Sequence, residues 1–170
     1  MKSRTLLFSL LTFALAFTFS ESKAQKTKQE RKAAEEALVK KSVEEKQYVF
    51  TARSANPTGG RSINLTSIYE LKVYGDSVIC DLPYFGRAFT ATAATGGGIN
   101  FTSTNAEYTS TDAKKGGWDI KIKPKDVSDI REVNLFISPS GYTSVTVTSN
   151  SRQSISYYGT VSERKYKKKK

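Results

Sequence analysis

The sequence predicts a mainly β protein: an antiparallel barrel or sandwich of about eight to ten strands, preceded by one N-terminal helix. From Tyr48 onward, Thr, Ser, Val, Ile, Tyr and Phe recur in short alternating runs that Gly, Asn, Asp and Pro interrupt, which is typical of strands and turns. No helical pattern separates these runs, so consecutive strands are expected to pair antiparallel through short turns. Closing such a sheet, or folding it double, removes its exposed edges and therefore favours a barrel or a sandwich.

The first element is a predicted signal peptide over residues 1–24. Lys2 and Arg4 supply a positive start, and an uncharged, mostly apolar run of 14 residues follows from Leu6 to Phe19. Ser22-Lys23-Ala24 resembles a signal peptidase site, and cleavage is expected directly after it. A retained anchor is the weaker interpretation, because a spanning helix needs about 20 apolar residues. No cysteine stands at the cleavage site, so we predict a periplasmic or secreted protein that is neither a lipoprotein nor transmembrane after cleavage.

A charged helix is predicted over residues 25–47. Thr27 and Glu30 have the spacing of a capping box, and the rest of this stretch contains no Gly or Pro. Its charges include i,i+4 pairs such as Lys40 with Glu44. Its apolar face is thin, so the helix is expected to lie across the domain or to project from it, with a partner-binding helix as the alternative.

Residues 48–163 are predicted to form the antiparallel β domain. Residues 124–131 are expected to be a loop or a single helical turn, and residues 74–77 and 150–152 are expected to connect hairpins. The predicted strands are Tyr48–Ala52, Ile68–Val73, Val78–Leu82, Tyr84–Thr92, Ile99–Ser103, Ala106–Ser110, Trp118–Lys123, Val133–Ser138, Tyr142–Ser149 and Gln153–Val161.

Alternation assigns side chains to the two faces of these strands. Val145 and Val147 alternate with polar neighbours, and Ile155 and Tyr157 on the returning strand are expected to pack beside them. Cys80 shares a face with apolar neighbours, so we expect a buried, unreactive thiol.

The basic charge is concentrated at the C-terminal end. Removing residues 1–24, which hold three basic residues and one acidic residue, lowers the net charge from +11 to +9. Residues 48–163 hold eleven basic and ten acidic residues, so the β domain is nearly neutral and no nucleic-acid partner is expected. The tail of residues 164–170 is expected either to contact an anionic lipid or glycan surface or to be a solvated chain. Its basic residues are Arg164, Lys165, Lys167, Lys168, Lys169 and Lys170.

The composition disfavours several chemistries. The chain has no histidine and one cysteine, which removes histidine-based catalytic sites, ordinary zinc sites and an intrachain disulfide. Asp112, Asp119, Asp126 and Asp129 lack the spacing of a calcium loop and are expected to be surface carboxylates. We therefore predict that the protein is not an enzyme and that it has no catalytic residue, no metal ligand and no cofactor. An acid-dyad hydrolase is the remote alternative.

Tyr84, Phe85, Arg87 and Phe89 are the candidate ligand-binding residues. They stand in one aromatic segment, where strand alternation would place the arginine between two phenylalanines on the same face. The glycine between them permits close backbone approach, so the segment could form an aromatic-walled anion site. The alternative is a packed strand, bent at its proline and glycine, whose arginine pairs with a nearby carboxylate.

Five motifs resemble a known exported bacterial family. The motifs are Gly75-Asp76-Ser77-Val78, Leu82-Pro83-Tyr84-Phe85-Gly86-Arg87-Ala88, Ile99-x-Phe101, Ser140-Gly141 and Arg152-x-x-Ile155-x-Tyr157-x-Gly159. Over residues 39–162 the chain is similar to the family of domain of unknown function 4251. The resemblance implies export, a single domain after a signal peptide and no established activity, and it carries over no catalytic residue.

These observations predict a non-enzymatic, exported binding module of the cell envelope. Its ligand would be a small molecule at the mouth of the barrel, or its partner a protein on the barrel surface. The alternative is a structural or surface-associated protein that its basic C-terminal tail holds in place.

Overall fold

The structure is a computed structural model that describes residues 19–90, 97–114 and 116–163. Most of the predicted signal peptide, and all of the predicted basic tail, lie outside the described residues. Within the described ranges, no helix is both long enough and apolar enough to cross a membrane. The chain divides into two compact units, one ending at Glu35 and the other beginning at Glu36.

Helix α2 spans Phe19–Glu44, so it begins before the predicted start at residue 25 and ends before residue 47. The predicted N-terminal cap at Thr27 is therefore wrong for the full chain, because that residue lies inside the helix. The preceding residues contain no Gly or Pro and let the helix continue. The predicted i,i+4 pairing is confirmed, since the Nζ of Lys40 lies 3.8 Å from a carboxylate oxygen of Glu44.

The last turns of α2 belong to the same compact unit as the β domain. Val39 and Val43 are buried in the domain's hydrophobic core, whereas Leu38 is half exposed. Ser42 is also buried, and its hydroxyl donates a hydrogen bond to the backbone oxygen of Leu38. A thin apolar face is thus sufficient, because two valines are enough to pack the end of this helix on the core.

In the part of the chain that the structure describes, ten antiparallel strands form the sheet, which confirms the predicted fold class. Their order is β5-β4-β3-β1-β10-β9-β8-β7-β6, with the short β2 paired to β1. The strands are β1 (Gln47–Pro57), β2 (Ile63–Asn64), β3 (Glu70–Tyr74), β4 (Ser77–Pro83), β5 (Gly98–Ser103), β6 (Ala106–Asp112), β7 (Trp118–Pro124), β8 (Ile130–Ile137), β9 (Tyr142–Ser149) and β10 (Ile155–Glu163).

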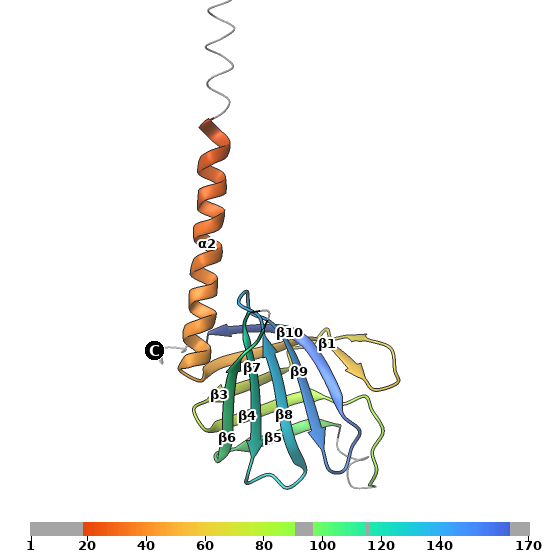
Figure 1. Ribbon diagram of the computed structural model, residues 1–170. Coiled ribbons are helices and arrows are strands. Elements are labelled where there is room, and N and C mark those ends of the chain that lie inside the picture. Colours follow the sequence, from red (N-terminus) through yellow and green to blue (C-terminus); the bar gives the residue numbers. More distant parts are fainter. Residues whose placement is uncertain (1–18, 91–96, 115, 164–170) are drawn as a thin grey trace, which may run out of the picture. The chain divides into compact units, whose positions relative to one another are not determined.

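The sheet curls into a nearly closed barrel (Figure 1). Strands β6 to β9 cross in front of β1, β3, β4 and β5. The long β1 pairs with β10 along its length, and the register shifts between Ala52 and Ser54. Such a bulge bends and twists a strand, which helps one sheet to turn back on itself. Strands β5 and β6 are the two ends of the order, and Asp126 fastens the turn between them by accepting hydrogen bonds from Ser103 and Thr104.

Side chains fill the interior of the barrel. The largest fully buried residues include Tyr48, Phe50, Leu82, Ile122 and Tyr157. The predicted pairing of the last hairpin is confirmed, because Ile155 lies opposite Val147 and Tyr157 opposite Val145. The interior is therefore a packed core of the kind that small barrels form, and a ligand site has to be sought at an end or on the outer face.

The predicted strand over Tyr84–Thr92 is wrong for residues 84–90, which are the part of it that the structure describes. Strand β4 ends at Pro83, and residues 84–90 form a loop with a single bridge, from Ala88 to Arg152. A proline cannot donate to a ladder and a glycine favours a bend, so the strand ends here. The other predicted strands are present with shifted ends, and the two-residue β2 was not predicted.

Candidate functional site

The loop of residues 84–90 is held in place by Tyr84. Its hydroxyl lies 2.7 Å from the backbone oxygen of Arg87 and 2.9 Å from that of Gln153, and it can donate its one proton to either. A Cβ atom at Gly86 would collide with this hydroxyl, so the glycine is what lets the tyrosine fold back over its own loop. Burial raises the pKa of Tyr84, and the positive charge of Arg152 acts in the opposite direction.

Backbone hydrogen bonds fasten the same loop to the turn between β9 and β10. The backbone N–H of Phe89 donates to the oxygen of Ser151 at 2.7 Å, and the N–H of Gln153 donates to the oxygen of Arg87 at 3.0 Å. The turn after β1 joins them, because the Thr58 hydroxyl donates to the oxygen of Ser154 at 2.8 Å. Three loops from distant parts of the sequence thus form one end of the barrel.

A cavity of about 470 Å³ lies between these loops. Its lining combines one guanidinium, one amide, one aromatic ring and the glycine-containing turn after β1, and none of the lining residues that the structure describes is acidic. The lining residues are Pro57, Thr58, Gly59, Gly60, Phe85, Gly86, Arg87 and Gln153.

The structure brings together two of the four predicted ligand-binding residues. Phe85 and Arg87 line the cavity, and Tyr84 supports the loop beside it. Phe89 is 67% exposed and does not line it, so the predicted sharing of one strand face by Phe85 and Phe89 is wrong. The strand alternative is wrong as well, because Arg87 is exposed and pairs with no carboxylate among the described residues.

Arg152 lies beneath the loop and was not predicted. It is only 9% exposed, and its Nη1 donates to the backbone oxygen of Gly98 at 2.7 Å. Its guanidinium carbon is 5.2 Å from the centre of the Tyr84 ring, a distance at which a cation is attracted to an aromatic face. Arginine in a polar hairpin turn gives no sequence signal of burial, which is why this residue was missed, as were Gln153 and the turn after β1.

Two of the four aspartates that were predicted to be surface carboxylates, Asp126 and Asp129, accept hydrogen bonds from neighbouring residues. The hydrogen bonds from Ser103 and Thr104 lower the pKa of Asp126. The carboxylate of Asp129 accepts hydrogen bonds from the hydroxyls of Ser149 and Ser151. Over the described part of the chain, no group of three or more Cys, Asp and Glu residues is placed to hold a metal ion.

Cys80 is buried, as the sequence predicts. Burial raises the pKa of its thiol, and the negative charge of Asp81 adds to the effect. A neutral thiol inside a core is a poor nucleophile, so this residue packs as a small apolar group.

The arrangement at the end of the barrel suits a small ligand with an anionic group and an apolar part. An exposed guanidinium presents a planar set of donors to a carboxylate or phosphate. The ring of Phe85, which is 43% exposed, offers an apolar surface beside it. The interior of the barrel offers neither feature, because its side chains are enclosed.

Comparison with known proteins agrees with the fold. The family model described as "Domain of unknown function (DUF4251)" matches residues 30–161. A solved structure, a DUF4251 family protein from Bacteroides eggerthii DSM 20697, aligns with a TM-score of 0.57 and 14% sequence identity, covering 77% of this chain and 89% of that one. No match was found among curated proteins.

Proposed function

This chain belongs to the family of domain of unknown function DUF4251, and from that premise we propose that it is an exported binding module for small anionic ligands. The pattern of residues 1–24 supports export, and a periplasmic or secreted location follows from cleavage after Ala24. The proposed site is the cavity between the loops at the end of the barrel.

One observation carries the proposal: the guanidinium of Arg87, which pairs with no carboxylate of the described residues, lines a cavity whose described lining holds none. The guanidinium of Arg87 keeps its donors available for a carboxylate or phosphate, because none of the described residues supplies an acidic partner. The volume of about 470 Å³ is within the usual range for small-molecule sites. The ligand's carboxylate or phosphate would be the missing partner.

The other residues of the cavity would orient the ligand. Phe85 would contact its apolar part, and the side-chain amide of Gln153 can both donate and accept a hydrogen bond. Tyr84 and Arg152 act from behind the loop: the tyrosine hydroxyl holds the backbone of Arg87, and the buried arginine lies against the tyrosine ring. Their role is to position the loop before a ligand arrives, which lowers the entropy cost of binding.

A thermal-shift screen tests this proposal. The probes are benzoate, phenyl phosphate, N-acetyl amino acids and a sugar phosphate, each titrated against the purified protein. We expect at least one of them to raise the melting temperature, because a ligand that binds only the folded state stabilises it. The Arg87→Ala and Arg87→Gln variants should lose the shift.

The matched control is Arg53→Ala, which removes an exposed arginine outside the cavity lining and should keep the shift. Calorimetric titration of the responding probe then gives its affinity. An unchanged melting temperature with every probe would refute the proposal, and so would a shift that survives the loss of Arg87.

A further inference from the structure

Three exposed aromatic residues lie on the outer face of neighbouring strands, and none of them lines the loop cavity. Phe136 on β8, Tyr142 on β9 and Tyr158 on β10 are 37%, 69% and 56% exposed. Phe136 and Tyr158 both lie opposite Ser144, so they occupy one rung of the sheet on either side of it. Phe136 and Tyr158 are two strand spacings apart, or about 10 Å. Tyr142 lies two residues from Ser144 along β9, or about 7 Å. We refer to these three residues as the aromatic triad.

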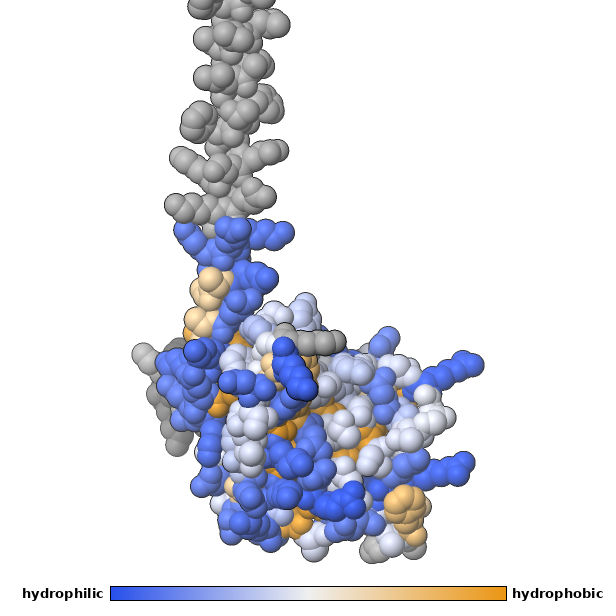
Figure 2. Space-filling model, viewed as in Figure 1, coloured by the Kyte–Doolittle hydropathy of each residue, from blue (hydrophilic) through white to orange (hydrophobic). Residues whose placement is uncertain are grey.

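A hollow of about 450 Å³ adjoins the aromatic triad on the same face. Phe136 and Ser144 line it and so connect the two features. Apart from these and the buried core residues Ile120 and Leu135, the lining consists of short hydroxyl residues, one amide and two charged residues. They are Thr109, Thr111, Asp119, Lys121, Asn134 and Thr146. Figure 2 views this face and shows pale and blue residues around smaller orange areas.

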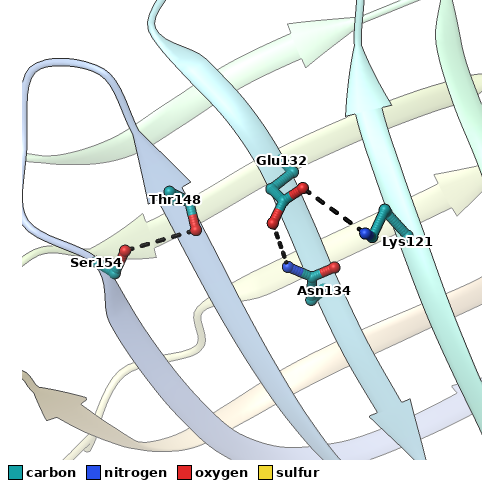
Figure 3. A network of polar contacts seen from close by, with 5 residues as sticks. All are labelled: Lys121, Glu132, Asn134, Thr148 and Ser154. Atoms are coloured by element: carbon teal, nitrogen blue, oxygen red, sulfur yellow. Dashed lines mark hydrogen bonds and ion pairs between the residues drawn. The ribbon is translucent and has the colours of Figure 1, made fainter.

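Side-chain contacts hold this polar surface in place (Figure 3). The amide of Asn134 donates to one carboxylate oxygen of Glu132 at 2.9 Å, and the other oxygen lies 4.0 Å from the Nζ of Lys121. The hydroxyls of Thr146 and Ser156 are 2.9 Å apart. A surface whose polar groups are already oriented loses less entropy when it binds a ligand.

The charge of the face indicates what kind of ligand fits it. The hollow has one acidic and one basic residue in its lining, and Glu132 pairs with that lysine from beside it, so charges of both signs lie close together. An ionic ligand would gain little there, whereas a neutral polyol can use the hydroxyls and amide as hydrogen-bond partners. The C–H groups on one side of a sugar ring are weakly positive and suit the negative face of an aromatic ring. Hydroxyl side chains between the rings interrupt the continuous apolar core that a stable protein interface needs.

We propose that the outer face of β6–β10 binds a neutral oligosaccharide, with sugar rings on the aromatic triad and their hydroxyls over the adjoining hollow. This site is separate from the loop cavity and does not depend on it. The proposal identifies the ligand by its chemistry as uncharged, rich in hydroxyl groups and more than one sugar unit long, because the triad and the hollow extend across several strands.

Affinity electrophoresis tests the inference. The purified protein is run in native gels that contain soluble starch, barley β-glucan, galactomannan, xylan or dextran. We expect at least one polysaccharide to slow the protein, and the Tyr142→Ala and Tyr158→Ala variants each to weaken its affinity about threefold to tenfold, as the loss of a stacked ring implies. The double variant should migrate as it does without polysaccharide.

Two controls separate the possible explanations. Ile68→Ala removes another exposed apolar side chain, 76% accessible and away from this face, and should leave the retardation unchanged. Arg87→Ala should also be retarded normally, so failure of the loop site and failure of this one are distinguishable. No retardation in any gel refutes the proposal. So does sedimentation showing that the wild type is a dimer which Tyr142→Ala dissociates, because the face would then bind a second copy of the chain.

Discussion

Aromatic side chains occupy both the barrel interior and the loops at its end, but only the interior encloses them. Tyr48, Phe50 and Tyr157 are fully buried, whereas Phe85 and Phe89 are 43% and 67% exposed. The difference comes from the backbone rather than from the residue type. In a ladder every second side chain faces the core, and where the ladder ends the next aromatic residues have no core to enter. The interior therefore supplies stability, and the loop end supplies accessible chemistry.

The largest expected effect contrasts one phenylalanine from each region. Phe50→Ala should lower the free energy of unfolding by about 3–5 kcal/mol, because it removes a fully buried ring and leaves a cavity. Phe89→Ala should change it by less than about 0.5 kcal/mol, because that ring is already in water. Urea unfolding, followed by the fluorescence of the single tryptophan, Trp118, measures both values. Similar losses in the two variants would contradict the contrast.

The same contrast explains how much of the fold could be predicted. Alternation placed Cys80, Val145, Ile155 and Tyr157 on inward faces, and the structure confirms each of them as buried. These predictions succeed because period-two burial is a local property of a strand. The end of α2 was less predictable, because Val39 is buried only through the tertiary contact with the barrel.

The candidate site was harder to predict, because three loops distant in sequence form it. Phe85 and Arg87 could be identified as an aromatic and cationic cluster, and the structure places both in the cavity lining. The burial of Arg152 and the contribution of Gln153 depend on which hairpin lies beside the loop, and no local pattern carries that information. The end of the strand at Pro83 was readable in principle, yet the aromatic residues after it were assigned to a strand because aromatic residues favour strands.

The second effect concerns pH and separates buried groups from surface groups. Burial raises the pKa of the Cys80 thiol in the folded state. Its contribution to stability is therefore complete below the unfolded pKa of about 8.5 and is lost as the pH rises from there towards the folded pKa. By pH 10 this loss should be about 2 kcal/mol. Urea titrations at pH 8, 9 and 10 measure it, and Cys80→Ala should lose less over the same range.

The contribution of the surface carboxylates to stability changes with pH in the opposite direction. Hydrogen bonds from Ser103 and Thr104 lower the pKa of Asp126. A hydrogen bond from Asn134 lowers the pKa of Glu132. Their contributions are present above the unfolded values near pH 4 and are lost as the pH falls through the folded ones. Because the chain has no histidine, stability should be nearly constant between about pH 5 and pH 8. If wild type and Cys80→Ala lost equal stability between pH 8 and pH 10, the alkaline loss could not be assigned to the thiol of Cys80.

The smallest effect compares two tyrosine hydroxyls that each donate to a backbone oxygen. The buried hydroxyl of Tyr157 donates to the oxygen of Pro83 at 2.7 Å, so Tyr157→Phe removes a hydrogen bond inside the core and should cost about 1 kcal/mol. Tyr84 holds the exposed loop, where water can replace its hydroxyl. Tyr84→Phe should therefore leave global stability within about 0.5 kcal/mol but speed hydrogen exchange at the amide of Gln153. Unchanged exchange there would mean that the backbone bonds alone hold the loop, and Tyr84 would lose its role in positioning Arg87.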